Sequence, residues 1–389
     1  MPRRTEKAVS TLEQLLAAKE IAVTAGSGGV GKTTVAAALG VLATVNLGGK
    51  VLVLTVDPAR RLANAMGLEA FGNVEVRVPD AAFDQAGAEP RGELWAAMLD
   101  TKASWDDLVR RHAPDAATRD RILENPLYRN ITGKFVQSHD YIAMERLYEL
   151  HHTGEYDLIV VDTPPTRNAI DFLEAPERMA DFFSSRLLRW LLAPYQSRFF
   201  NVASKPFYQV ADRILGSQFL EDIAEFFMLF QTMHEGFVQR AREVTRLLED
   251  RRTTFVVVST LEPAPVREAE FFIDALSDRR FHLGGLVLNK VLPGYFRRSD
   301  ATGAAKQLCA EAEVIAAKLP AAVGEPADIA RVLREVGESF LNFQVVAKRE
   351  AEQRAELAAA PDVVATAPYF ETDIFDLGGL CRLGEAIWR

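Results

Sequence analysis

The residues best suited to chemistry form one run of eight, Gly26 to Thr33, with the sequence GSGGVGKT. The run matches the phosphate-loop pattern G-x-x-x-x-G-K-[ST] at each fixed position. Its glycines let the backbone curl so that several N–H groups point at one anion, and the start of a following helix adds its positive dipole end. Lys32 can supply charge to the terminal phosphates, and the Thr33 hydroxyl can ligate Mg²⁺. We therefore expect ATP and Mg²⁺ to bind at Gly28, Gly29, Val30, Gly31, Lys32, Thr33 and Thr34.

Two aspartates follow short apolar runs that predict buried strands. Asp57 comes directly after residues 50–56 (KVLVLTV), and Asp162 comes directly after residues 157–161 (DLIVV). The carboxyl ends of parallel strands border the ligand crevice, so both carboxylates are expected there. Asp162 is our candidate to hold Mg²⁺ with Thr33, and Asp57 our candidate to orient the attacking water. With Lys32 they form the predicted catalytic set. The alternative for Asp162 is a cap on a turn, and the alternative for Asp57 is a helix N-cap.

A base pocket is suggested by residues that follow two later apolar runs. Asn289 follows residues 285–288 (GLVL), and its amide offers a donor and an acceptor to an adenine edge. Pro368 and Tyr369 follow residues 363–367 (VVATA) and could form the opposite wall. A turn asparagine and a plain loop are the alternatives.

The elements that must position these residues alternate between strand and helix. Residues 19–25 and 254–259 are further apolar strand candidates, and residues 34–45 predict a helix directly after the loop. This alternation predicts an α/β fold, a doubly wound and mostly parallel sheet of the phosphate-loop NTPase kind. Two stretches without an obvious strand predict an inserted helical subdomain. The expected nucleotide domain is residues 1–92, 151–175 and 251–389, and the helical subdomain is residues 93–150 and 176–250.

Composition excludes several classes of protein. The chain has 389 residues and a net charge of −9, which argues against a nucleic-acid surface. Its two cysteines lie far apart in the sequence, so neither a disulfide framework nor a cysteine zinc site is expected. The N-terminus is charged, and no apolar run reaches the length of a membrane span. We expect a soluble, cytoplasmic protein with no integral membrane span.

Aromatic residues concentrate in the second helical stretch. Ten of the 23 phenylalanines lie between residues 171 and 230. Such density could line a groove for an apolar helix, but helical aromatics more often pack the helices on one another, and we favour packing. Residues 348–360 (KREAEQRAELAAA) have the charge spacing of an exposed helix.

Taken together, these motifs resemble the arsenical-pump and tail-anchored-protein-targeting ATPases, a deviant-Walker group related to partition ATPases and the nitrogenase iron protein. The segments that carry the resemblance are GSGGVGKT, TVDPARRL, VDTPPTRNAIDFL, LVLNKV and APYFETDIFDLGGL. Membership implies an ATP-dependent dimer, with itself or a related subunit, in which Asp57 belongs to the first switch and Asp162 to the second. It also implies that the helical stretches bind a protein or apolar-helix client.

The chain departs from that family in three respects. Ser27 stands where relatives carry the signature lysine that reaches phosphates across the dimer, and a hydroxyl supplies no such charge. Arg60, Arg61 and Arg167 are candidate replacements as switch or cross-dimer arginines, with surface ion pairs as the alternative. The zinc C-x-x-C pair and the arsenite-binding cysteines have no counterpart, so no arsenite site is evident.

Two hypotheses of different class follow from these observations. The first is a slow ATP-hydrolysing switch that couples nucleotide state to partner binding. The alternative is a nucleotide-gated binding module or chaperone subunit with negligible hydrolysis on its own. A DNA-partitioning role is disfavoured by the net charge of −9.

Overall fold

The computed structural model describes residues 11–56, 63, 65–68, 72–129, 136–164, 170, 173–175, 177–178, 181, 225–230, 232–357 and 361–388. Asp57, Arg60, Arg61 and Arg167 lie outside these residues, as does most of the phenylalanine-rich segment. Their predicted roles stay predictions.

Within the described residues, the strands form one eight-stranded sheet in the order β3-β4-β2-β5-β1-β6-β7-β8. Only β3 runs antiparallel to its neighbour, as expected for a mostly parallel α/β sheet. The chain leaves β1 toward β2 on one side and later returns toward β6 on the other, so the strand order reverses at β1. A ligand crevice is expected outside the carboxyl ends of the strands at such a point. The strands are β1 Ile21–Gly26, β2 Gly49–Thr55, β3 Val76–Arg77, β4 Gly92–Met98, β5 Leu158–Asp162, β6 Thr253–Ser259, β7 Leu283–Val291 and β8 Val363–Pro368.

Alternate residues of the central strands enter two separate cores. Ile21 and Val23 of β1 pack with the helices on one face, while Ala22 packs with those on the other. The first face is covered by α5 Thr101–His112, α8 Val136–His152, α13 His234–Glu249 and α14 Pro263–Asp278. The second is covered by α1 Leu12–Leu16, α2 Lys32–Asn46, α4 Asp80–Ala86 and α18 Leu377–Trp388. Burial on both faces explains why these strands read as continuous apolar runs.

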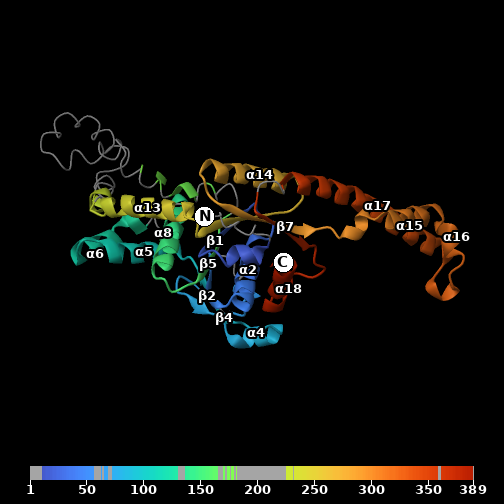
Figure 1. Cartoon of the computed structure of the whole chain (residues 1–389), viewed down its shortest axis with the longest axis horizontal. Helices are drawn as coiled ribbons and strands as arrows, with labels where there is room; N and C mark the ends of the chain where they lie inside the picture. Colours follow the sequence, from blue (N-terminus) through green and yellow to red (C-terminus); the bar gives the residue numbers. More distant parts are fainter. Residues whose placement is uncertain are drawn as a thin grey trace, which may run out of the picture.

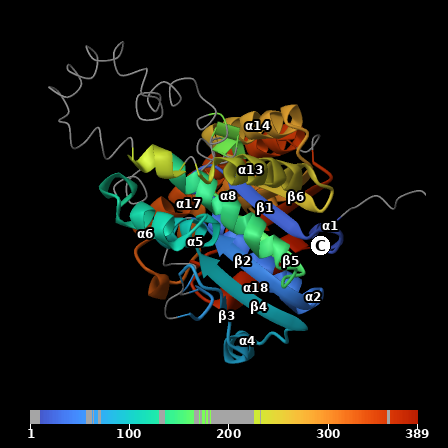
Figure 2. The ribbon, with the colours of Figure 1, turned by 90° about the vertical axis from the view of Figure 1, so that its left-hand side faces the viewer.

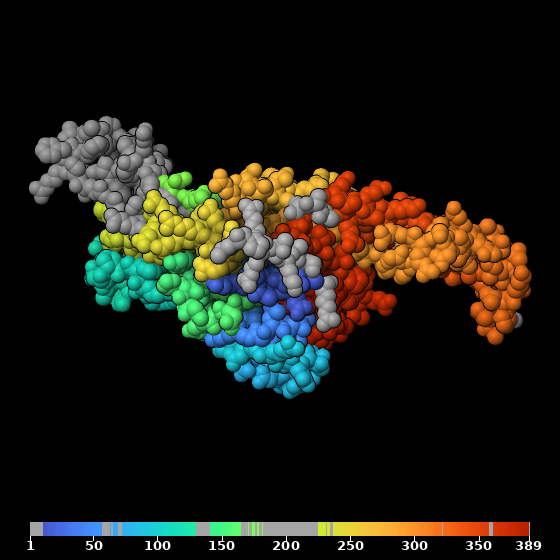
Figure 3. Space-filling view, in the orientation of Figure 1, coloured from blue at the N-terminus to red at the C-terminus, as the bar shows by residue number. Residues whose placement is uncertain are grey.

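Two helical regions extend from opposite ends of the sheet (Figure 1). At one end α5, α8 and α13 gather with α6 Ala116–Glu124, and Figure 2 shows α8 in front of the central strands. The other end is a projection of residues 294–357, which we call the arm. Figure 3 shows the outer part of the arm projecting from the rest of the molecule, while the end of α17 meets the sheet core at Leu357. It consists of η1 Gly294–Arg297, α15 Ser299–Ala310, α16 Ala312–Ala316, η2 Ala321–Val323 and α17 Pro326–Leu357.

The sequence prediction needs one correction in the sheet. Residues 93–150 were expected to contain no strand, but β4 pairs in parallel with β2 along its whole length. Its sequence GELWAAM combines glycine, glutamate and alanine, which are poor strand formers, so propensity gave no signal. Pairing with β2 and with the antiparallel β3 decides the conformation instead. The division into a nucleotide domain and a helical subdomain stays a prediction.

The described aromatics of the helical region pack on one another. Phe230 and Phe237 stack with ring centroids 5.9 Å apart, and Trp105 lies 6.3 Å from each of them. All three side chains are buried. Of the three, only Phe230 belongs to the phenylalanine-rich segment, and for Phe230 the expectation of packing is confirmed. No described helix has the length and apolar character needed to cross a membrane.

Candidate functional site

The glycine-rich loop lies where the sequence places it, between the end of β1 and the start of α2. Gly31 caps α2 with a φ of 90° and a ψ of 23°, and Lys32 is the first helical residue. This left-handed conformation suits glycine and turns the chain sharply into the helix. The N-terminus of α2, a 15-residue helix, therefore opens at the carboxyl edge of the sheet. Backbone N–H groups and the helix dipole favour an anion there.

Two of the loop glycines are also required by their neighbours. A Cβ atom at Gly26 would come within 2.1 Å of the Val258 carbonyl oxygen on the adjacent β6. A Cβ atom at Gly31 would come within 2.4 Å of Asn289 Nδ2. At Gly28 and Gly29, by contrast, an added Cβ would meet nothing within 4 Å, so these residues form the open crest of the loop. The loop is thus fixed at its ends and open at its middle, the shape of a phosphate cradle.

Lys32 and Asp162 form a buried ion pair at the centre of the site. Lys32 Nζ lies 3.2 Å from Asp162 Oδ1, and both side chains are buried. The Thr55 hydroxyl, at the end of β2, donates to Asp162 Oδ2 at 2.9 Å. The carboxylate is therefore held on both oxygens by groups from two other elements. The structure thus brings together two of the three predicted catalytic residues; the third, Asp57, lies outside the described residues.

Two threonine hydroxyls hold the end of β5 against β1. The Thr163 hydroxyl donates to the Thr24 carbonyl oxygen at 2.8 Å, and the Thr24 hydroxyl donates to the Val161 carbonyl oxygen at 3.0 Å. Both threonines are buried. These two hydrogen bonds fix the position of Asp162 relative to the loop that follows β1. The sequence singled out Asp162, but it gave no signal for the threonines that position it.

Asn289 braces the loop from β7. Its Nδ2 donates to the Val30 carbonyl oxygen at 2.8 Å, and its Oδ1 accepts from the Lys290 backbone N–H at 2.9 Å. The side chain is buried. One amide hydrogen and one lone pair of Asn289 are thus engaged within the chain, which leaves one of each for a ligand. The predicted contact with an adenine edge stays a prediction.

Lys290 is a candidate site residue that the sequence analysis did not select. Its backbone φ is 58°, a left-handed conformation that is uncommon outside glycine. That conformation lets the side chain fold back over the loop, where Nζ donates to the Gly29 carbonyl oxygen at 3.2 Å. The side chain is exposed. Lys290 thus brings a positive charge to the loop crest at Gly29. Gly29 is close in sequence to Ser27, which carries no charge.

The two remaining predicted pocket residues end the neighbouring strand. Pro368 is the last residue of β8, and the Tyr369 backbone N–H donates to the Val291 carbonyl oxygen of β7 at 3.0 Å. Tyr369 is exposed. Both residues lie at the same carboxyl edge as Asn289, and their role in a base pocket stays a prediction.

The donor set fits a triphosphate with a hard divalent cation. Thr33 and Thr34 lie half-buried in the first turn of α2, and Asp162 supplies a buried carboxylate nearby in the fold. Hydroxyl and carboxylate oxygens are ligands that Mg²⁺ prefers. Ser27 is buried within the loop, so its hydroxyl does not reach outward as a lysine ammonium could.

A second titratable cluster lies in the helical region. His112, Glu145 and Glu149 bring their potential ligand atoms within 4.8 Å of one another. Arg240 Nε lies 2.5 Å from Glu145 Oε1, and Arg111 Nη1 lies 2.6 Å from Glu149 Oε1. Desolvation, helped by the two arginines, lowers the pKa of His112 to about 4. Because guanidinium groups already balance both carboxylates, we interpret the cluster as an ion-pair network.

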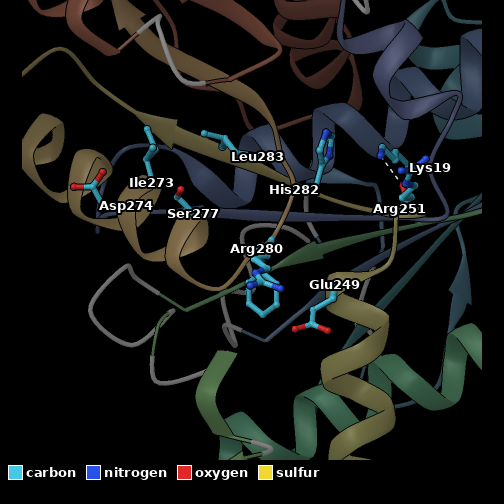
Figure 4. A pocket seen from close by; sticks show the side chains of 10 residues that line it. Lys19, Glu249, Arg251, Ile273, Asp274, Ser277, Arg280, His282 and Leu283 are labelled. Atoms are coloured by element: carbon cyan, nitrogen blue, oxygen red, sulfur yellow. Dashed lines mark hydrogen bonds between the residues drawn. The ribbon is translucent and has the colours of Figure 1, made fainter. Parts of the chain in front are cut away.

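A separate cavity of about 830 Å³ lies at the opposite edge of the sheet. Figure 4 shows side chains entering it from α13, from α14 and from the starts of the strands. The lining includes basic Lys19, Arg251 and Arg280 and acidic Glu249 and Asp274, and Lys19 Nζ donates to the Arg251 carbonyl oxygen at 2.6 Å. The cavity contains none of the predicted site residues. Its mixed charges select no single class of ligand.

Comparison with known proteins identifies a matching family. A sequence model of the family described as anion-transporting ATPase matches residues 19–310. The match spans the loop, Asp162 and Asn289, and it ends within the arm.

Individual relatives are distant but span most of the chain. An "ATPase ASNA1 homolog" from Entamoeba dispar is 27% identical over 276 residues, 69% of this chain and 75% of that protein. An "ATPase GET3" from Malassezia globosa is 26% identical over 271 residues, 69% of this chain and 71% of that protein. "ATPase BagA" from Mycobacterium tuberculosis is 24% identical over 376 residues, 93% of this chain and 90% of that protein.

Proposed function

The chain belongs to the anion-transporting ATPase family, and on this premise we propose that it is a slow, Mg²⁺-dependent ATPase whose nucleotide state controls binding of a partner. The observation that carries the proposal is the buried pair of Lys32 and Asp162 directly below a glycine loop that is open at its crest. The family match supports ATPase activity in general, and this geometry supports assigning that activity to Lys32 and Asp162.

Each residue of the site has a separate task in this proposal. The loop N–H groups and the start of α2 bind the phosphates, and Lys32 neutralises charge that develops on them. Thr33 and Asp162 would hold Mg²⁺, which lowers the energy of the charged transition state when bound. Asp57 would orient the attacking water, and Asn289 with Pro368 and Tyr369 would border the base.

Slow turnover follows from what the loop lacks. Ser27 supplies no charge to the phosphates, and the structure buries it. Lys290 brings a cation to the Gly29 carbonyl oxygen from within the same chain, and we propose that it partly replaces the missing charge. Arg60, Arg61 and Arg167 remain further candidates. A flexible exposed lysine is a weaker substitute than a positioned donor, because water screens it.

Steady-state ATP hydrolysis by the purified chain tests the proposal. We expect slow, Mg²⁺-dependent turnover that Lys32→Ala abolishes. Lys50→Ala, at the start of β2 and paired with Glu155, is the matched control and should hydrolyse at the parent rate. Since Lys32→Ala leaves Asp162 buried without its cation, the folded state of the variant is checked by circular dichroism. Lys32→Arg retains the charge and should also lose turnover, because its planar fork differs from a point charge.

The alternative function is a nucleotide-gated binding module without hydrolysis of its own. Ser27 favours it, because a buried serine hydroxyl supplies no positive charge to phosphates across a dimer interface. ATP binding without turnover in the pure chain, followed by turnover when a related subunit is added, would support this alternative. Activity in the pure chain supports the first proposal.

We further propose that ATP-bound chains dimerise through the carboxyl edge of the sheet, with another copy or a related subunit, and that the helical subdomain binds a protein or apolar-helix client. The open loop crest supports the first point, because a facing subunit could reach phosphates there. Sedimentation with and without a non-hydrolysable ATP analogue tests it. A mass that does not change with nucleotide would contradict it.

A further inference from the structure

The arm carries an exposed apolar stripe along α17. One face of this 32-residue helix packs on α15: a Cβ atom at Gly337 would come within 2.6 Å of Cys309 Sγ, and Gln344 donates to the Thr302 hydroxyl. The exposed stripe includes Val336 and Phe343, which come one residue before Gly337 and Gln344 of the packed face. One residue corresponds to a rotation of about 100° around the helix, so the stripe lies beside the packed face. We call it the α17 seam: Ile329, Val332, Val336, Ser339, Phe343 and Val346.

The spacing of the α17 seam is that of a coiled coil. Its residues alternate at intervals of three and four, the a and d positions of a heptad. Val332, Val336, Phe343 and Val346 are nevertheless 46 to 52% exposed, although the Phe343 ring lies 5.4 Å from that of Phe296. Ile329 at the tip is half-buried, because it packs beside α16. Along much of its length the seam borders an open groove of about 460 Å³, with Tyr295 and Phe296 of η1 at its rim. Contiguous apolar surface of this kind marks an interaction site on a soluble protein.

The charges beside the α17 seam decide which partner fits it. The flanking g positions read Asp328, Glu335, Asn342 and Arg349, so they run from acidic at the arm's tip to basic near the sheet. Asp328 and Arg349 are both exposed, and the ion pair of Asp328 with Arg331 is also exposed and therefore weak. If a second copy of α17 lay alongside in the antiparallel direction, its basic end would lie beside the acidic end of the first copy. The α17 seam is therefore complementary to itself.

We propose that two copies of this chain pair through the α17 seam as antiparallel helices. In that arrangement Asp328 of each copy lies beside Arg349 of the other, at both ends of the contact. A parallel pair would set Asp328 and Glu335 beside Leu333 and Phe340, which offers no charge partner. The part of α17 that packs on α15 projects beyond the sheet, and the helix enters the sheet core only toward its end at Leu357. Because α17 is about 48 Å long, two such helices can overlap along this projecting part. The facing pairs are then Val336 with Ser339, Val332 with Phe343 and Ile329 with Val346.

This contact is separate from the nucleotide-dependent dimer and does not rest on the proposed function. It involves residues of the arm alone, and no group of the phosphate site contributes to it. The arm contact is therefore expected in the absence of nucleotide and also in a Lys32→Ala chain.

Sedimentation equilibrium of the full chain without nucleotide tests the proposal. We expect a reversible dimer in the micromolar range that Val336→Glu weakens by about tenfold or more, because a buried carboxylate has no partner in the seam. Val345→Glu is the matched control: Val345 is 60% exposed on the same helix but lies off the seam, and its dissociation constant should not change. A chain that stays monomeric overturns the proposal, whether or not the seam binds another protein or lipid. Equal effects of the two variants also overturn it.

Charge exchange and cross-linking test the direction of the helices. Asp328→Arg and Arg349→Asp should each weaken the dimer, and the double variant should restore it. With Cys309 and Cys381 replaced by serine, Val332→Cys mixed with Phe343→Cys should form a disulfide-linked dimer under oxidation, while neither variant alone should do so. Cross-linking of Val332→Cys with itself would indicate parallel helices and overturn the antiparallel arrangement.

Discussion

The carboxyl edge of the sheet and the α17 seam are both unusual surfaces, but the chain builds them in opposite ways. At the sheet edge, charged groups are buried and held: Asp162 has a partner on each carboxylate oxygen. At the seam, apolar groups are exposed, and the chain supplies no cover for them along much of their length. Both departures from ordinary burial indicate function. The first prepares a site for a small anion, and the second prepares a surface for another helix.

The largest expected effect is on catalysis at the sheet edge. Asp162→Asn should reduce the rate of ATP hydrolysis by roughly 100-fold or more, because the amide cannot supply the charge that balances the cation and Lys32. Asp157→Asn, just before the opposite end of the same strand, should change the rate by no more than about twofold. Steady-state kinetics on both variants compares them. Equal rates for the two variants would remove Asp162 from the catalytic set.

The next effect is on the stability of the loop. Gly31→Ala should lower the free energy of unfolding by about 2 kcal/mol, because its φ of 90° and the nearness of Asn289 Nδ2 both oppose a side chain. Gly28→Ala should change it by less than about 0.5 kcal/mol, since its Cβ would meet nothing within 4 Å. Urea denaturation without nucleotide measures both. A Gly31→Ala chain as stable as Gly28→Ala would show that the loop relaxes freely.

A smaller effect is expected on ATP affinity when the exposed lysine at the loop is removed, with a lysine of the arm as the control. Lys290→Asn should weaken ATP binding by about three- to tenfold at low salt, and less at high salt, because an exposed cation is screened. Asparagine tolerates the left-handed backbone at this position, so the fold is preserved. Lys306→Asn makes the same exchange on α15 of the arm and should leave ATP affinity unchanged. Calorimetric titration measures both, and an equal loss in both variants would indicate a general charge effect.

The smallest effect concerns pH. Partial desolvation, together with nearby Arg240 and Arg111, lowers the pKa of His112 from 6.5 to about 4, so the unfolded chain binds more protons than the folded chain between these values. The free energy of unfolding should therefore fall as pH decreases from about 6.5 toward 4, by under about 1 kcal/mol from this exposed side chain. His112→Gln should flatten that part of the profile. The arm has no histidine, so dimerisation through the seam should not follow the same profile.

The comparison also shows what the sequence could predict. Six strands and the helix after the loop were predicted because buried parallel strands have a plain apolar pattern, and the loop because its chemistry restricts residue types. Asp162 and Asn289 lie beside the loop because strand ends share one edge. Their roles toward a ligand stay predictions.

What the sequence missed depends on tertiary contacts. The strand β4 has alanine and glycine where strand formers are usual, and its pairing with β2 decides its conformation. Lys290 reaches the loop only because its backbone turns left-handed, which an ordinary lysine gives no reason to expect. The helix predicted over residues 348–360 covers only the last part of α17, which ends at Leu357, and the apolar residues before it have the pattern of a packed face. A pattern cannot say whether the partner of such a face lies in the same chain.

One pair of variants tests the central claim, that phosphate chemistry and arm pairing belong to separate regions. Steady-state ATP hydrolysis is measured for Lys32→Ala and Val336→Glu beside the parent chain, with sedimentation equilibrium on the same samples. The account predicts that Lys32→Ala loses hydrolysis and keeps the arm dimer, while Val336→Glu keeps hydrolysis and loses that dimer. Hydrolysis at the parent rate by a folded Lys32→Ala chain would contradict the account.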